Sequence, residues 1–328
     1  MSLPTIAMLA TGGTIAGRGS DPTRSTDYRP GMASVEELLE AVPGLENMVQ
    51  IEAEQFSNLG SSGLTNQHLI NMAKRLTEVL AQEHICGAIV THGTDVLEET
   101  AYFLNISVKS AKPIVVTGSM RPSTAISADG PANILASVRT AIHPESVGRG
   151  VLVVLNDEIH AARDVTKSHA QRVHTFVSRE LGPLGVLTGD RIDYYRTSQR
   201  QHTFDTPFDI MAVNQLPRVD LVTTHIDNDS VAIDAYLAAG AQGIVVAAAG
   251  GGATTPGMTP GLQRAAAAGV KIVLATRTGS GMVRGWNRGE RQAIGAGTLN
   301  PYKARLLLSL ALAHTQDSAI IQEWFNRF

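Results

Sequence analysis

The sequence predicts an α/β protein with a larger N-terminal domain, built on a mostly parallel sheet with helices on both faces, and a smaller C-terminal α/β domain. Apolar segments of strand length alternate along the chain with segments whose apolar residues recur at helical spacing. The 328 residues suffice for two packed domains. A polar stretch with two prolines, residues 194–217, separates two such series. We therefore expect domains at residues 1–193 and 218–328, joined by a linker at 194–217.

Each expected element follows from its own local pattern. In the first domain, strands are predicted at Ile6–Ala10, Val49–Phe56, Gly87–Val90, Pro113–Thr117 and Gly150–Leu155. Helices are predicted there after the capping box of Ser34 and Glu37, after Thr65, and over residues 96–104 and 132–142. In the second domain, strands are predicted at Val219–Thr224, Gly243–Ala249 and Val270–Thr276, and helices around residues 232–239, 262–268, 302–313 and 318–325.

Composition and charge exclude several classes of partner. The formal net charge is −3 and the chain has no basic blocks, which argues against nucleic acid. No apolar run approaches the roughly 20 residues that span a bilayer, so no membrane partner is expected. Cys86 is the single cysteine, so an intrachain disulfide is impossible. The first strand begins within a few residues of the N-terminus, which predicts a cytoplasmic protein, or a periplasmic one whose leader has been removed.

The glycine-rich turn after the first strand does not match a phosphate-binding loop. Gly12–Gly17 has the spacing of a Walker A loop, but Arg18 and Gly19 replace the required lysine and hydroxyl. The dinucleotide pattern G-x-G-x-x-G also fails, because its middle glycine is missing. The chain has no H-E-x-x-H segment, cysteine pair or G-x-S-x-G elbow. No cofactor and no metal are therefore expected.

Two strand-ending turns place hydroxyls at the predicted carboxyl edge of the sheet, where ligands bind in open α/β folds. They read Thr11-Gly12-Gly13-Thr14 and Thr91-His92-Gly93-Thr94-Asp95. Thr14 has a second interpretation as an ordinary turn residue. Asp95, with Glu98 three residues on, also fits a helix cap that needs no function.

The loop from Arg18 to Pro30 is long, polar and rich in small residues, which is typical of either functional or disordered segments. Its one aromatic residue, Tyr28, either packs on the surface or closes over a site. A threonine becomes a nucleophile only when a base removes its proton. Lys167, if it loses its charge beside a hydroxyl, and Tyr28, as a proton relay, supply suitable groups. This set suits acyl transfer.

Several segments resemble the bacterial L-asparaginases. The two signature segments are T-G-G-T-I-A-G at Thr11–Gly17 and T-H-G-T-D-x-x-E-E-T-A-Y-F-L at Thr91–Leu104. S-A-D-G-P at Ser127–Pro131, R-D-V-T-K at Arg163–Lys167 and G-T-L-N-P-x-K-A-R at Gly297–Arg305 are similar to the same family. The resemblance runs nearly end to end and is closest to the periplasmic-type branch.

The resemblance implies a homotetramer, a dimer of dimers, that converts asparagine to aspartate and ammonia through an acyl-threonine intermediate without a cofactor. It implies that Thr14 is the primary nucleophile and that Tyr28 closes over it. The second triad would be Thr94, Lys167 and Asp95. For the substrate, the resemblance implies that Ser61 binds the carboxylate and Asp95 the α-ammonium group, with Ser62 and Thr94 beside them.

Three positions depart from the family pattern. Ser62 stands where some members carry a longer polar side chain. Ala253 stands in the loop where a partner subunit commonly supplies Asn or Ser, and Glu290 is out of register with the glutamate it supplies. Because these contacts are fewer, we expect asparagine to be strongly preferred over glutamine. A glutaminase-asparaginase of broader specificity is the rival enzyme, and a non-catalytic amino-acid-binding protein is the rival class.

Overall fold

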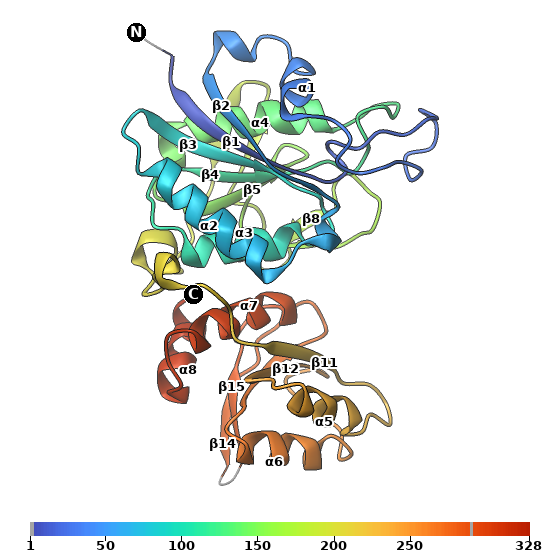
Figure 1. Ribbon diagram of the computed structural model, residues 1–328, viewed down its shortest axis with the longest axis vertical. Helices are drawn as coiled ribbons and strands as arrows, with labels where there is room; N and C mark the ends of the chain where they lie inside the picture. Colours follow the sequence, from blue (N-terminus) through green and yellow to red (C-terminus); the bar gives the residue numbers. More distant parts are fainter. Residues whose placement is uncertain (1–2, 289–290) are drawn as a thin grey trace. The chain divides into compact units, whose positions relative to one another are not determined.

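The computed structural model describes residues 3–288 and 291–328 (Figure 1). Within these ranges, the surroundings of the side chains are described for all residues except 286–288 and 291–292. The chain forms two compact units, Met1–Thr206 and Pro207–Phe328. The division falls inside the stretch 194–217 in which a linker was expected. This stretch includes a fully buried side chain, because Phe208 packs against the rings of Trp324 and Phe328 in the second unit.

The first unit is built on an eight-stranded sheet in the order β10-β9-β6-β5-β4-β3-β1-β2. Its parallel part comprises β1 (Thr5–Gly12), β2 (Gln50–Leu59), β3 (Ile85–Thr91), β4 (Ile114–Thr117) and β5 (Val151–Leu155). An antiparallel extension comprises β6 (Glu158–Ala161), β9 (Gly185–Thr188) and β10 (Arg191–Tyr194). Ala10 of β1 lies opposite Thr91 of β3, so these two strands end side by side.

Helices cover both faces of this sheet, as the sequence predicts. Figure 1 shows α2 (Asn66–Leu80) and α3 (Leu97–Ser107) on one face, and α1 (Val35–Glu40) and α4 (Gly130–Ile142) on the other. Alternate residues of β1, Ile6 and Met8, join Ile134 and Val138 of α4 in one buried cluster. Short 3-10 turns lie at Leu45–Asn47, Ser61–Gly63, Pro144–Ser146, Thr203–Asp205 and Ile210–Ala212.

The short strands that follow β5 were not predicted from the sequence. Besides β6, β9 and β10, these are β7 (Val165–Lys167) and β8 (Phe176–Ser178), which form a two-stranded antiparallel sheet of their own. Each has only three or four residues and mixes polar with apolar side chains, so no run of strand length marks it. The omission matters because β7 carries Lys167.

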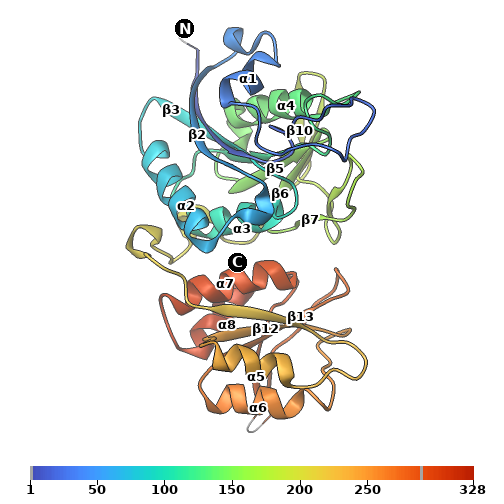
Figure 2. The ribbon, with the colours of Figure 1, turned by 45° about the vertical axis from the view of Figure 1, so that its right-hand side comes forward.

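The second unit is a smaller sheet in the order β11-β12-β13-β15-β14. Its strands are β11 (Val219–Thr223), β12 (Gly243–Ala248), β13 (Lys271–Thr276), β14 (Trp286–Arg288) and β15 (Arg291–Gly295). Among the described strands of this unit, β14 alone runs antiparallel to its neighbour. Figure 2 shows the helices α5 (Val231–Ala238) and α6 (Thr259–Ala267) on one face, and α7 (Pro301–Leu312) and α8 (Ser318–Arg327) on the other. The predicted fold class is thereby confirmed. None of the described helices combines the length and apolar character that crossing a membrane requires.

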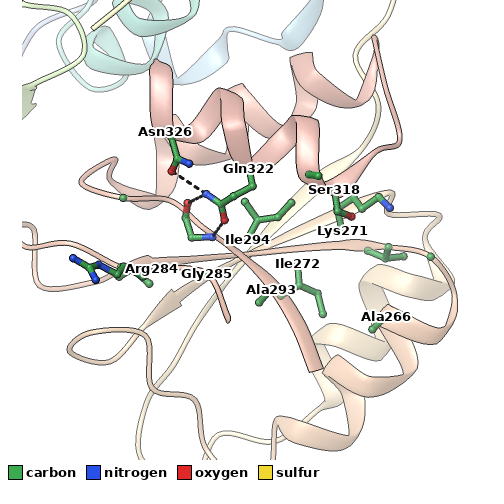
Figure 3. Close-up of a pocket in the computed structure, with 16 residues that line it drawn as sticks. Ala266, Lys271, Ile272, Arg284, Gly285, Ala293, Ile294, Ser318, Gln322 and Asn326 are labelled. Carbon is green, nitrogen blue, oxygen red and sulfur yellow. Dashed lines mark hydrogen bonds between the residues drawn. The ribbon is translucent and has the colours of Figure 1, made fainter. Parts of the chain in front are cut away.

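A cavity of about 570 Å³ opens in the second unit between the end of α6, the start of β13 and α8 (Figure 3). On its wall, the Gln322 amide pairs with Gly295 like a strand neighbour: its Oε1 accepts the Gly295 N–H at 2.8 Å and its Nε2 donates to the Gly295 carbonyl at 3.2 Å. A side chain on Gly295 would overlap the backbone of Gly285, so two glycines meet where this amide inserts. The wall of the cavity is therefore held by hydrogen bonds within the unit.

Candidate active site

The turns that end β1 and β3 are in direct contact with each other. Gly12 and Gly13 have φ angles of 98° and 79°, which non-glycine residues rarely adopt. A Cβ on Gly13 would overlap the backbone of Gly93. Thr14 and Thr94 each follow one of these touching glycines and are 8% and 4% exposed. The two candidate hydroxyls are thus brought to one place by adjacent strands.

The pairing of β2 with β1 is irregular where β1 ends. Ala10 pairs with Gln55, but Gly12 pairs with Leu59, so β2 contains two more residues than β1 between these pairs. The Gln55 amide donates to the carbonyl oxygens of Ala10 and Ser57 at 3.2 and 2.7 Å. These bonds link the irregular end of β2 to β1. This role of Gln55 was not predicted from the sequence.

Tyr28 reaches Thr14 from the loop after β1. Its phenol oxygen lies 2.7 Å from Thr14 Oγ1, and either hydroxyl can donate. The ring lies where a side chain on Gly17 would otherwise stand. Arg18 and Arg29 pair through both backbone groups at 3.0 Å and close the base of the loop. The loop therefore presents Tyr28 to the threonine.

Lys167 joins the second threonine to an aspartate. Its ammonium donates to Thr94 Oγ1 at 3.0 Å and to Asp95 Oδ1 at 2.8 Å. The lysine side chain is 15% exposed, whereas that of Asp95 is 69% exposed. Asp95 therefore interacts with the lysine while still presenting carboxylate surface to solvent.

The interpretation of Asp95 as a helix cap is wrong. Helix α3 begins at Leu97 with Val96 at its N-cap position, and no side chain caps it. The Asp95 carboxylate is bonded to Lys167, and its backbone N–H donates to Ser61 Oγ at 3.2 Å. The local sequence favoured a cap because the true partner of the carboxylate, Lys167, lies 72 residues further along the chain.

The two serines after β2 lie in different environments. Ser61 is 4% exposed, and its Oγ would lie 2.8 Å from a Cβ on Gly93. Ser62, in the same 3-10 turn, is exposed. Ser61 is thus built into the contact between the β1 and β3 turns, and Ser62 lies outside it.

The other two positions that depart from the family pattern, Ala253 and Glu290, fall within residues 207–328, the second unit. Ala253 is exposed and closes a tight turn after β12 through two backbone hydrogen bonds with Ala249, each of 2.9 Å. Glu290 lies outside the described residues. Within residues 3–288 and 291–328, no three His, Cys, Asp or Glu side chains are grouped so that they could hold a metal ion.

A neutral histidine lies behind the Thr94 turn. His92 is fully buried, and burial lowers its pKa from 6.5 to about 4. Its Nδ1 contacts the Gly93 carbonyl at 2.6 Å, an interaction that favours the protonated ring but does not outweigh burial. At neutral pH the imidazole therefore brings no charge to the turn.

Comparison with known proteins agrees with this geometry. Residues 5–200 match the family described as "Asparaginase, N-terminal", and residues 218–325 match the "Glutaminase/Asparaginase C-terminal domain". The chain belongs to the asparaginase family. The signature segments at 11–17 and 91–104 had indicated this family, and their turns are the ones that meet in the structure.

Individual relatives in the asparaginase family cover nearly the whole chain. It is 46% identical to "L-asparaginase 2" of Bacillus subtilis over 99% of this chain and 87% of that protein. It is 37% identical to the "Glutaminase-asparaginase" of Pseudomonas fluorescens biotype A over 98% of this chain and 90% of that protein. The structure of a "Probable Cytoplasmic L-asparaginase" from Campylobacter jejuni superposes with a TM-score of 0.96 at 38% identity, covering 100% of both chains.

One part of this asparaginase site was not identified from the sequence. A third strand-ending turn, Gly118-Ser119-Met120-Arg121 after β4, packs against Thr94. The signal was present, because glycine and a hydroxyl residue follow a parallel strand here as they do after β1 and β3.

Proposed function

We propose that the protein is an L-asparaginase, which hydrolyses the side-chain amide of asparagine to give aspartate and ammonia through an acyl-threonine intermediate. The observation that carries this proposal is the Thr94–Lys167–Asp95 chain of hydrogen bonds beside the Thr14–Tyr28 pair. Two hydroxyls, each hydrogen-bonded to a group that can carry a proton, and an amine beside them suit acyl transfer, whereas amino-acid binding alone does not need them.

In the first half-reaction, Thr14 Oγ1 attacks the amide carbon of the substrate. The hydroxyl proton passes through Tyr28, which is already 2.7 Å away, to the departing nitrogen. A C–O ester bond forms on Thr14, the C–N bond breaks, and ammonia leaves.

In the second half-reaction, water replaces ammonia at the same carbon. Lys167, through Thr94 Oγ1 at 3.0 Å, accepts a proton from the attacking water when the amine is neutral. The ester bond breaks, the Thr14 oxygen regains a proton, and aspartate is released. Ser61 binds the substrate α-carboxylate and Asp95 its α-ammonium, because one offers a buried hydroxyl and the other an exposed carboxylate.

We also propose that asparagine is strongly preferred. Glutamine is longer by one methylene, which typically changes specificity by roughly 10–200-fold. Exposed Ser62 has a short reach, so the site has little binding energy with which to align the longer chain. Ammonia release from asparagine, from glutamine and from neither is the test. Comparable kcat/KM values for the two amides would favour a glutaminase-asparaginase, and release from neither would favour a binding protein.

The assembly and compartment are further parts of this proposal. We infer a homotetramer, as the resemblance to the asparaginase family implies. Light scattering in solution tests it, and a monomer would contradict it. We infer a cytoplasmic location, which the name of the Campylobacter jejuni structure supports, although one relative is named "Probable L-asparaginase periplasmic". Cell fractionation distinguishes the two compartments.

A further inference from the structure

The turn after β4 forms a wall against one side of Thr94. A Cβ on Gly118 would lie 2.5 Å from the His92 carbonyl oxygen and 3.1 Å from Thr94 Cγ2. Only glycine lets the backbone approach this closely. The wall therefore meets the methyl group of Thr94, while the hydroxyl of the same residue is bonded to Lys167 at 3.0 Å.

This contact bears on the rotamer of Thr94. The methyl and the hydroxyl share one carbon, so rotation about χ1 moves both together between a few staggered positions. With the methyl against Gly118, Oγ1 points to Lys167. If the wall moved away, other rotamers that turn Oγ1 from Lys167 would become accessible.

Two residues at the start of α4 hold the wall in place. The Asp129 carboxylate accepts the backbone N–H groups of Met120 and Arg121, each at 2.9 Å. Asn133 donates from Nδ2 to the Gly118 carbonyl at 2.9 Å and to Asp129 Oδ2 at 3.2 Å. Three backbone groups of the turn, at positions 118, 120 and 121, are thus bonded to these two side chains.

The bonds of Asp129 and Asn133 are directed at the turn and not at their own helix. Asp129 occupies the N-cap position of α4, but its side chain makes no capping bond. Asn133 is 3% exposed, and its Oδ1 accepts the backbone N–H of Asn156 at 3.0 Å, at the end of β5. The pair therefore fixes the β4 turn relative to both the helix and the neighbouring strand.

We propose that Asp129 and Asn133 are positioning residues that set the Thr94 side chain for its bond with Lys167. Their side-chain hydrogen bonds go to the turn, to each other and to Asn156, so they act on Thr94 through the Gly118 wall. The inference deepens the proposed function and rests on it, because it assigns these residues to the step that Thr94 serves.

The test is a double-mutant cycle between Asn133→Ala and Thr94→Ser, measured as kcat and KM for asparagine. Serine keeps the hydroxyl and lacks the methyl, so the wall has nothing to hold in that background. In the Thr94 background, Asn133→Ala should lower kcat about 10–100-fold, with KM changed by less than about 3-fold. In the Thr94→Ser background, the same change should lower kcat by less than about 3-fold. Equal effects in both backgrounds would overturn the proposal.

Asp129→Asn is a second variant, which retains the shape of the side chain and one acceptor for the turn. It should lower kcat less than Asn133→Ala does, and this loss should again be smaller in the Thr94→Ser background than with Thr94. Thr140→Val is the matched control, because it removes a buried hydroxyl of the same helix that donates to the Ala136 carbonyl at 2.8 Å. It should leave kcat unchanged. A loss of kcat in the control equal to that of Asn133→Ala would show a general effect of helix α4 and would overturn the proposal.

A crystal structure of the Asn133→Ala protein provides a readout that does not depend on activity. The proposal expects a displaced Gly118 turn and Thr94 Oγ1 beyond hydrogen-bond distance of Lys167 Nζ. An unchanged Thr94 rotamer would overturn it. If the unmodified protein released no ammonia from asparagine, the proposed function would fail by itself, while this structural comparison would still decide the role of Asn133.

Discussion

Replacing Lys167 by methionine removes the amine that joins Thr94 to Asp95 and leaves an apolar chain of similar length. The base assigned to the second half-reaction is then absent. Loss of a general base typically costs about 10²–10⁴-fold in turnover, which corresponds to roughly 3–5 kcal/mol of transition-state stabilisation.

The same substitution should change stability little. Asp95 is 69% exposed, so the ion pair with Lys167 is largely screened by solvent. Such a pair contributes at most about 1 kcal/mol. We therefore expect kcat to fall by two or more orders of magnitude while the urea midpoint changes only slightly.

The variant Lys167→Arg distinguishes a role of Lys167 as a base from a role as a fixed positive charge. Arginine preserves the charge beside Asp95, but it does not lose its proton in proteins. It should be nearly as inactive as Lys167→Met. Lys112→Met is the control, since Lys112 precedes the opposite, amino end of β4 and donates to the Gln82 carbonyl at 2.6 Å. Near-normal turnover of Lys167→Arg would refute the assignment of Lys167 as a base.

Three further predictions follow from the site. Thr14→Ala and Thr94→Val should each lower asparagine turnover by several orders of magnitude with the fold retained, and circular dichroism beside the assay checks both. Amide exchange in loop 18–30 should slow when aspartate is added, whereas equal protection would argue against a lid. Because burial lowers the pKa of His92 from 6.5 to about 4, the unfolded chain binds its proton first as pH falls. The free energy of unfolding should therefore be highest above pH 6.5 and fall by up to about 3 kcal/mol as the pH is lowered to 4. Urea titrations of His92→Gln should show no such fall between these pH values.

The fold was predictable where single segments carry a strong pattern. The apolar strand at 6–10 and the capping box of Ser34 and Glu37 are both present in the structure. The short strand β7 was not predictable, because in the described part of the chain it pairs with β8 alone, and that pairing depends on a return of the chain at residues 168–175.

For the site, the sequence predicted that Thr14 and Thr94 lie at one edge of the sheet, because the carboxyl ends of parallel strands meet at the same edge. No local sequence pattern predicts that Lys167 lies beside Thr94, which is 73 residues away in the chain. That assignment came from the resemblance to a known family. The roles of Asn133 and Gln55 were not visible either. Both side chains donate to backbone carbonyls of distant segments. Every residue has a backbone carbonyl, so the sequence does not indicate which one a side chain will bind.

The central claim is that the acyl group of asparagine is carried by Thr14. Its most direct test is mass spectrometry of Lys167→Met protein quenched in acid after exposure to asparagine, since loss of the base slows removal of the acyl group. We expect one aspartyl group on the peptide that contains Thr14, and none after the additional change Thr14→Ala. An aspartyl group on Thr94 or on any other residue would contradict the account.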